Sequence, residues 1–187
     1  MSPITHGLIG WLTANISRKL TRREMGLITL AGVVPDVDGL GLIVEVLTRN
    51  TAHPLLWWTE YHHALHNLGF ALLVTAAAFF LSRNRVLTAL LAFASFHLHL
   101  VGDLVGSRGP DGDQWTIPYL APFSNAWALS WKYQWELNAW PNFAITGLAL
   151  AATFWLAYKK GFSVVGLISE KADRAFVQTI RNRFSEK

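Results

Sequence analysis

The sequence predicts an all-α integral membrane protein: a bundle of about four to five apolar helices with an aromatic interfacial loop and an amphipathic C-terminal helix. Three observations support this prediction. Of the 187 residues, 52% are hydrophobic and only 15% are charged, below the roughly 25% typical of soluble domains. Residues 86–106 form an apolar run long enough to cross a bilayer. Nine Trp and eleven Phe are typical of a protein with aromatic anchors at a membrane interface.

Apolar stretches define the expected helices. They are residues 5–17, 24–34, 39–48, 67–81, 86–106 and 142–158. Pro35 is expected to end the second stretch, because proline disfavours a helical residue before it. Pro141 opens the last one near the first-turn position that proline favours. Some stretches fall short of the roughly 20 residues needed to span a bilayer, so a compact bundle partly sunk in the membrane is an alternative.

Two segments differ from these helices. Residues 107–140 are rich in Trp, Tyr, Pro and Asn and show no strand alternation, so we expect an aromatic cap at the interface. In the tail, residues 162–187, an apolar residue recurs every four positions with basic residues between, which predicts an amphipathic helix. This helix either lies on a membrane surface or packs on its own domain. We therefore divide the chain into a membrane-embedded domain, 1–160, and a basic helix, 161–187.

Composition excludes several classes. The formal net charge of +4 is too small to indicate nucleic-acid binding. The chain has no Cys, so disulfides and thiolate metal sites are excluded and any metal must use nitrogen and oxygen ligands. The N-terminal stretch does not resemble a signal peptide, because Arg18 and Lys19 follow its apolar part rather than precede it.

Basic and candidate metal-binding residues alternate along the chain. His6 precedes a helix that ends at Arg18, Arg23 one that ends at Asp36, His66 one that ends at Arg83, and Arg85 one that ends at Asp103. The positive-inside rule makes the basic ends cytoplasmic. The candidate ligands are therefore expected at one depth, on the extracytoplasmic side of a multi-pass protein.

The strongest candidates lie in the run 86–106. Ionisable side chains are costly in hydrocarbon and usually mark function. His99 and Asp103 are four residues apart and share one helical face, which suits joint binding of a divalent metal. The alternative is a hydrogen bond between them that only satisfies their burial. His97 lies about 200° from His99 around the helix and is expected to have a supporting role.

Two further clusters supply candidate partners. His62, His63 and His66 open the next apolar helix, and the spacing does not decide which of them share a face. Asp36 and Asp38 follow a proline stop, and carboxylates at such a turn suit a hard or borderline cation. A simple Asx turn is the alternative for this pair.

The loop offers weaker candidates. Arg108 is a possible phosphate contact in a substrate-binding role. Asp111 and Asp113 resemble half of a calcium loop, but no Glu follows at the required spacing. His53, in a loop before a proline, has no expected role.

Several short motifs together resemble a known family. They are THGLIG at 5–10, GVVPDVDG at 32–39, HHALHN at 62–67, HLVGD at 99–103 and PYLAPFSN at 118–125. Over most of residues 1–160 the chain resembles a bacterial family of inner-membrane proteins predicted to be metal-dependent hydrolases. That family is distantly similar to zinc-dependent phospholipase C and related nucleases, which are all-helical and bind zinc in a cleft.

The resemblance assigns roles to particular residues. It matches His6 to the early histidine, Asp36 to the aspartate before the second histidine, His62 or His63 to that histidine, and His99 with Asp103 to a His-x-x-x-Asp pair. The further histidine ligands of that superfamily have no counterpart, because no His follows Asp103. One or two metal ions are therefore expected, and zinc is the metal that the resemblance implies.

These observations lead to one functional expectation. The chain is expected to hydrolyse a phosphoester, on a lipid or lipid-linked substrate, through a metal-activated water. The metal-ligand candidates are His6, Asp36, His62, His63, His66, His99 and Asp103. Asp36 or Asp38, whichever is less engaged as a ligand, is the expected general base. Membrane lipids are the expected surroundings. The alternatives are a non-catalytic, metal-stabilised membrane scaffold or stress-response protein and, ranked last, a small metal or proton transporter.

Overall fold

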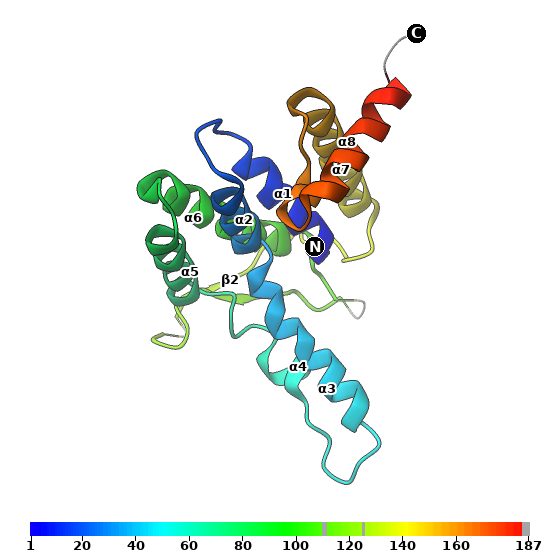
Figure 1. Ribbon diagram of the computed structural model, residues 1–187. Coiled ribbons are helices and arrows are strands. Elements are labelled where there is room, and N and C mark those ends of the chain that lie inside the picture. Colours follow the sequence, from blue (N-terminus) through cyan, green and yellow to red (C-terminus); the bar gives the residue numbers. More distant parts are fainter. Residues whose placement is uncertain (110–111, 125, 185–187) are drawn as a thin grey trace.

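Helices form almost all of the regular structure in the computed structural model, which describes residues 1–109, 112–124 and 126–184 (Figure 1). The α-helices are α1 (Pro3–Ala14), α2 (Arg22–Ala31), α3 (Gly41–Thr48), α4 (Trp57–Tyr61), α5 (Leu68–Leu81), α6 (Arg85–Gly106), α7 (Trp140–Lys160) and α8 (Glu170–Phe184). The remaining elements are the 3₁₀ helices η1 (Val34–Leu40) and η2 (Val164–Leu167) and the strands β1 (Ile117–Pro118) and β2 (Ala128–Leu129). The chain is mostly helical, as predicted.

Fewer helices than expected are long enough to span a membrane. Within the described residues, α6 and α7 have the length and apolar composition of a span. Helix α2 and the stretch Val34–Thr48 pass the same test together, but they are bent by 54°, as in a broken span or a re-entrant segment. Helix α5 has 14 residues, short of the roughly 20 that a span requires. The expected count of about four to five apolar helices is therefore not confirmed; among the described residues the structure supports two candidate membrane spans, or three with the bent pair.

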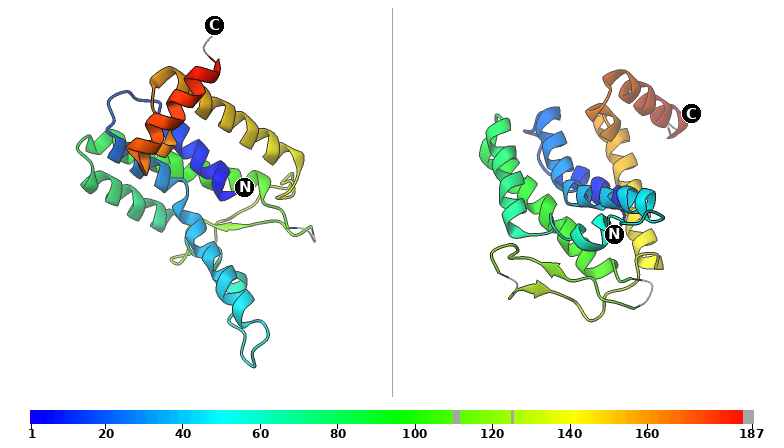
Figure 2. Two further views of the ribbon diagram at one scale, coloured as in Figure 1. Left: turned by 45° about the vertical axis from the view of Figure 1, so that its right-hand side comes forward. Right: turned by 90° about the horizontal axis from the view of Figure 1, so that it is seen from below.

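Helix α6 packs against α1, α2 and α5, and α7 packs against α1 and α8 (Figure 2). Glycines permit the closest approach among these helices. A Cβ atom at Gly10 would lie 2.9 Å from the carbonyl oxygen of Thr29, and one at Gly32 would lie 2.6 Å from Ser95 Oγ. Small residues let helix backbones approach closely in membrane proteins. This crossing fixes α1, α2 and α6 relative to one another.

The basic helix ends meet at one end of the bundle. The Glu24 carboxylate accepts hydrogen bonds from the backbone N–H groups of Arg83 at 3.0 Å and Asn84 at 2.7 Å. Lys160 Nζ donates to both the carbonyl and the side-chain oxygen of Asn15 at 3.0 Å. The end of α1, the start of α2, the α5–α6 turn and the end of α7 therefore lie together, as the charge pattern predicts.

The aromatic segment contains structure that we did not expect. Strands β1 and β2 pair antiparallel, with Ile117 opposite Leu129. Ile117 is completely buried and packs with Phe96 and Leu100 of α6. The expectation of a segment without strands is therefore wrong for this part of 107–140. Each strand is only two residues long, which is too short for an alternating pattern to show in the sequence.

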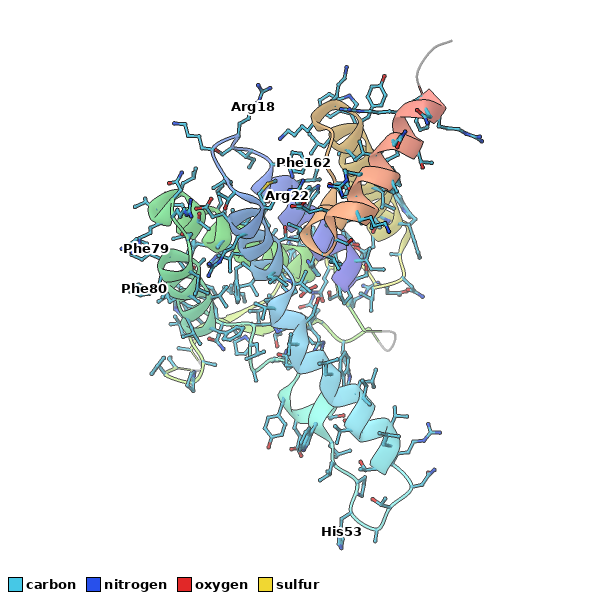
Figure 3. All side chains as sticks on the ribbon, in the orientation of Figure 1. Arg18, Arg22, His53, Phe79, Phe80 and Phe162 are labelled. Atoms are coloured by element: carbon cyan, nitrogen blue, oxygen red, sulfur yellow. The ribbon has the colours of Figure 1, made fainter. Side chains whose placement is uncertain are left out.

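Helices α3 and α4 form a hairpin that projects from the bundle (Figures 1 and 2). Helix α4 was not among the predicted elements. The two oxygens of Glu45 accept hydrogen bonds from the backbone N–H of Thr59 at 3.0 Å and from its hydroxyl at 2.9 Å, which fastens α3 to α4. Figure 3 shows His53, near the tip of the hairpin, far from Arg18 at the basic end.

The tail packs on its own domain in this structure. Val177 and Ile180 of α8 form a buried cluster with Ala157 of α7. The buried face also contains Asp173, one position from the four-residue pattern seen in the sequence. A helix turns once in 3.6 residues, so a strict step of four drifts around its surface. Residues 185–187 of the predicted helix lie outside the described part of the chain.

Candidate metal centre

Four of the predicted ligands converge at the end of the bundle opposite the basic helix ends. Asp36, His66, His99 and Asp103 each offer one ligand atom, and these atoms all lie within 4.8 Å of one another. We call these four residues the His–Asp group. The two histidines and Asp103 are buried, and Asp36 is partly buried. A buried group of two imidazoles and two carboxylates is the kind of site in which proteins hold a metal ion.

The separations within the group fit a metal centre. His99 Nε2 lies 3.2 Å from His66 Nε2, 3.0 Å from Asp103 Oδ2 and 3.7 Å from Asp36 Oδ1. His66 Nε2 lies 3.5 Å from the same Asp103 oxygen. Tetrahedral ligands bonded at roughly 2.0–2.1 Å lie about 3.3 Å from one another. The donors are imidazole nitrogen and carboxylate oxygen, which suit zinc and other divalent ions.

Helix α6 orients His99 and Asp103 together. The four-residue spacing places both side chains on one face, which points toward α1 and α2. His99 Nδ1 donates a hydrogen bond to the carbonyl oxygen of Gly32 at 3.0 Å. This bond leaves the Nε2 lone pair directed into the His–Asp group, which is the arrangement that metal-binding histidines require.

The two oxygens of Asp103 have separate roles. Oδ2 faces His66 and His99. Oδ1 accepts hydrogen bonds from His6 Nε2 at 3.1 Å, from Ser107 Oγ at 3.0 Å and from the amino group of Met1. His6, a predicted ligand, therefore lies beside the His–Asp group and forms a hydrogen bond with the Asp103 oxygen that faces away from His66 and His99. Burial lowers the pKa of His6, although Asp103 opposes this effect.

Asp38 orients His66 from the opposite side. Asp38 Oδ2 lies 3.3 Å from His66 Nδ1 and accepts a hydrogen bond from the backbone N–H of Leu65 at 3.1 Å. Asp38 Oδ1 pairs with His62 Nδ1 at 2.9 Å. Burial alone would lower the pKa of His66, but the carboxylates of Asp103 and Asp38 outweigh it and raise that pKa to about 9. The negative charge of these two carboxylates favours positive charge on or next to the His66 imidazole.

Asp36 is the least engaged carboxylate of the group. Its Oδ1 faces His99, while its Oδ2 is buried and has no hydrogen-bond partner among the described residues. Buried polar atoms are nearly always satisfied, so an unpartnered carboxylate oxygen beside a metal-binding group is a candidate for a ligand or proton contact.

His62 and His63 lie outside the His–Asp group. His62 pairs with Asp38 and stacks on Trp58 with 3.7 Å between ring centroids. His63 packs against Trp115 at 4.1 Å, and burial together with the neighbouring histidines lowers its pKa. Trp115, which sequence reasoning did not single out, thus connects the aromatic segment with the histidine cluster. Trp115 reaches this position through a tertiary contact, which the spacing of residues in the sequence does not predict.

The remaining candidates have structural partners. His97 donates to the Phe93 carbonyl oxygen at 2.8 Å and pairs with the Tyr119 hydroxyl at 2.9 Å, which joins α6 to the aromatic segment. Arg108 forms an ion pair with Glu136 at 3.4 Å. Asp111 lies outside the described residues. The Asp113 backbone oxygen accepts a hydrogen bond from Gly109, and His53 is exposed.

Gln134 is a second residue that sequence reasoning missed. Its buried side chain donates to the backbone oxygens of Asp103 and Leu104 at 3.0 and 3.1 Å and accepts from the backbone N–H of Trp115 at 2.7 Å. It thereby satisfies carbonyls at the end of α6 that have no helical partner. The same contacts place the aromatic segment over the site end of α6.

The fold and the site together define a helical membrane protein with a buried His and Asp group able to hold a metal ion. A family model described as "YdjM inner membrane protein" matches residues 1–171, and the chain belongs to this family. The match supports an inner-membrane location, as expected. No curated protein and no solved structure matches the chain.

The His–Asp group makes a direct prediction about metal content. We expect the purified protein to hold a divalent metal in stoichiometric amount, and the His99→Ala variant to lose at least about tenfold in metal affinity, because a buried ligand is removed. The His97→Ala variant, changed two positions away on the same helix, should retain the metal. Elemental analysis of the detergent-purified proteins measures this. Equal metal content in both variants would contradict the assignment.

Asp38 is expected to act on the metal through His66. Asp38→Asn removes the charge beside His66 Nδ1 but keeps the size of the side chain, so metal affinity should fall about 10–100-fold without being abolished. Competition with a chelator, followed by elemental analysis, gives the affinity. Glu60→Gln, the same change of charge at an exposed position of α4, is the control. An unchanged affinity in Asp38→Asn would show that Asp38 does not position the ligand.

Proposed function

We propose that this protein is a membrane-bound, metal-dependent hydrolase that cleaves a phosphoester in a lipid or lipid-linked substrate. The observation that carries the proposal is the His–Asp group together with the unpartnered carboxylate oxygen of one of its members, Asp36. A divalent cation held there, zinc by preference, would lower the pKa of its water and polarise a phosphoryl oxygen. Family membership agrees with a site at a membrane but does not assign an activity.

The geometry supports different roles for the two loop carboxylates. Both oxygens of Asp38 are taken by His62, Leu65 and His66, so Asp38 acts as a positioning residue. Asp36 Oδ2 has no such partner, and we assign it as the general base. It accepts a proton from the attacking water as the new oxygen–phosphorus bond forms. The ester oxygen–phosphorus bond then breaks, and the leaving alcohol oxygen takes up the proton from Asp36.

The surroundings of the site support a lipid over a soluble metabolite. The group lies at the end of α6, which has the length and composition of a membrane span. Trp115 and the aromatic segment lie over the same end. Arg108, now paired with Glu136, remains our candidate for a phosphate contact. A cationic guanidinium near such a site suits a phosphate group.

The distribution of ionisable residues favours a hydrolase over a transporter. A proton or metal relay needs ionisable groups through the depth of the membrane. In α6, no Asp, Glu, His, Lys or Arg occurs between Arg85 and His97, and in α7 none occurs before Lys159. The candidate ligands instead cluster at one level. A metal-stabilised scaffold without activity stays the main alternative, and only an activity measurement separates it from an enzyme.

Asp36→Asn provides the test of catalysis. With saturating Zn²⁺, we expect the wild-type protein in detergent to hydrolyse short-chain phosphatidic acid and p-nitrophenyl phosphate. The Asp36→Asn variant should lose about 100-fold in kcat because the general base is gone. Metal content is measured in parallel, with His97→Ala as the control. Metal-loaded wild-type protein that releases no phosphate from either compound would favour the scaffold, and full activity in Asp36→Asn would exclude Asp36 as the base.

We further propose a multi-pass topology with the site on the extracytoplasmic side. The basic ends of the helices meet at the opposite end of the bundle, and the positive-inside rule makes that end cytoplasmic. A reporter fused after Lys187 should therefore behave as cytoplasmic, and one inserted between Tyr133 and Gln134 as external. An alkaline phosphatase and green fluorescent protein pair reports both sides. The reverse pattern would overturn the orientation.

A further inference from the structure

An apolar groove lies between α3 and α4 at the base of the projecting hairpin. It has a volume of about 360 Å³, within the range of small-molecule sites. Its lining includes Val44 of α3, Trp57 and Tyr61 of α4, and the flanking residues Leu40 at the end of η1 and Leu65 after α4. Leu40 and Tyr61 are also exposed, so the groove opens to the outside.

The hairpin holds the groove open before any ligand arrives. Glu45 and Thr59 fasten the two helices through two hydrogen bonds, and Thr48 Oγ1 accepts a third from the backbone N–H of Leu55 at 3.0 Å. At Gly41 the backbones come so close that an added Cβ would lie 2.9 Å from the Trp57 carbonyl carbon. A preformed groove binds without the cost of ordering its walls.

The groove is continuous with the candidate metal centre. Asp38 is its one charged lining residue. The same carboxylate contacts His66 Nδ1 at 3.3 Å, and His66 Nε2 belongs to the His–Asp group. Only the imidazole of His66 therefore separates the wall of the groove from the group. The apolar groove and the candidate metal centre are therefore next to each other, with Asp38 contacting both.

The outside of the hairpin is suited to lipid. Neither α3 nor α4 has a fully buried residue. The outward side chains of α3 are large and apolar: Leu42, Ile43, Val46 and Leu47 are all exposed. Exposed apolar patches of this kind mark contact with a membrane or a partner. The hairpin follows the 54° bend after α2, as a re-entrant or interfacial segment does.

We infer that the groove between α3 and α4 binds an acyl chain of the lipid whose phosphoester lies at the His–Asp group. This inference rests on the proposed hydrolase function for the role of the headgroup, while the groove itself is a binding site with or without hydrolysis. It makes the substrate an acylated lipid phosphate. Its tail enters from the side of the hairpin, and the aromatic segment lies near the headgroup.

The test places a Trp in the groove and a second Trp outside it. Val44→Trp fills the groove, and Val46→Trp makes the same change on the outward face, where Val46 is 48% exposed. Leu40→Trp is a second groove variant at an exposed position, so it is expected to fold. Elemental analysis of bound Zn²⁺ establishes that each full-length variant retains its site.

Binding is measured in nanodiscs that contain phosphatidic acid with a photoreactive diazirine on one acyl chain. We expect cross-links to the groove-lining stretch, residues 37–65, of the wild-type protein. The groove variants should lower this labelling about tenfold, the effect of losing contact with roughly two methylene groups, while Val46→Trp should not. Labelling elsewhere, equal labelling in Val44→Trp and Val46→Trp, or cross-linking of the hairpin to a second copy of the chain would overturn the inference.

Hydrolysis separates the two proposals. The groove variants should lower kcat/KM for dioctanoyl phosphatidic acid about tenfold. Their kcat/KM for p-nitrophenyl phosphate should not change, because this compound has no acyl chain. An equal loss for both compounds would contradict the groove as an acyl-chain site. Groove labelling without hydrolysis of either compound would overturn the hydrolase and leave the lipid site intact.

Discussion

The burial of the Asp103 carboxylate constrains the rest of the structure. A carboxylate in a membrane-sized helix is stable only with close partners for both oxygens. His6 of α1 and Ser107 satisfy one oxygen, and His66 and His99 face the other. These partners come from different parts of the chain. The requirement to surround one charge therefore fixes how α1, α6 and the segment before α5 meet, and the glycines at the helix crossing make that approach possible.

The chain places its charges at opposite ends of the bundle, and this separation serves the site. Lys160 and the residues around Glu24 join the helix ends at the basic side. The middle of α6 and α7 contains apolar and small side chains that suit lipid or close helix packing. Imidazoles and carboxylates are thus concentrated at the other end, where four of them lie close enough together to share a cation.

The sequence predicts the helical class and much of the candidate site, but not its detailed contacts. The i, i+4 spacing of His99 and Asp103 places both on one face whatever the tertiary structure. Spacing alone did not choose among His62, His63 and His66. That choice depends on how the stretch before α5 packs on Asp38, and on Trp115 from a distant segment. Strands of two residues and the short α4 leave no periodic pattern, which is why they escaped prediction.

The two carboxylates after α2 show how local geometry separates functions within three residues. In a 3₁₀ helix each residue advances about 120°, so residues two apart point in different directions. In η1, Asp36 therefore faces His99, while Asp38 faces His62 and His66. This one turn therefore supplies two different groups. Asp36 can bind a metal or accept a proton, and Asp38 orients the candidate ligand His66. Asp38 also lines the apolar groove, so the same turn joins the candidate metal centre to the surface that we assign to the lipid tail.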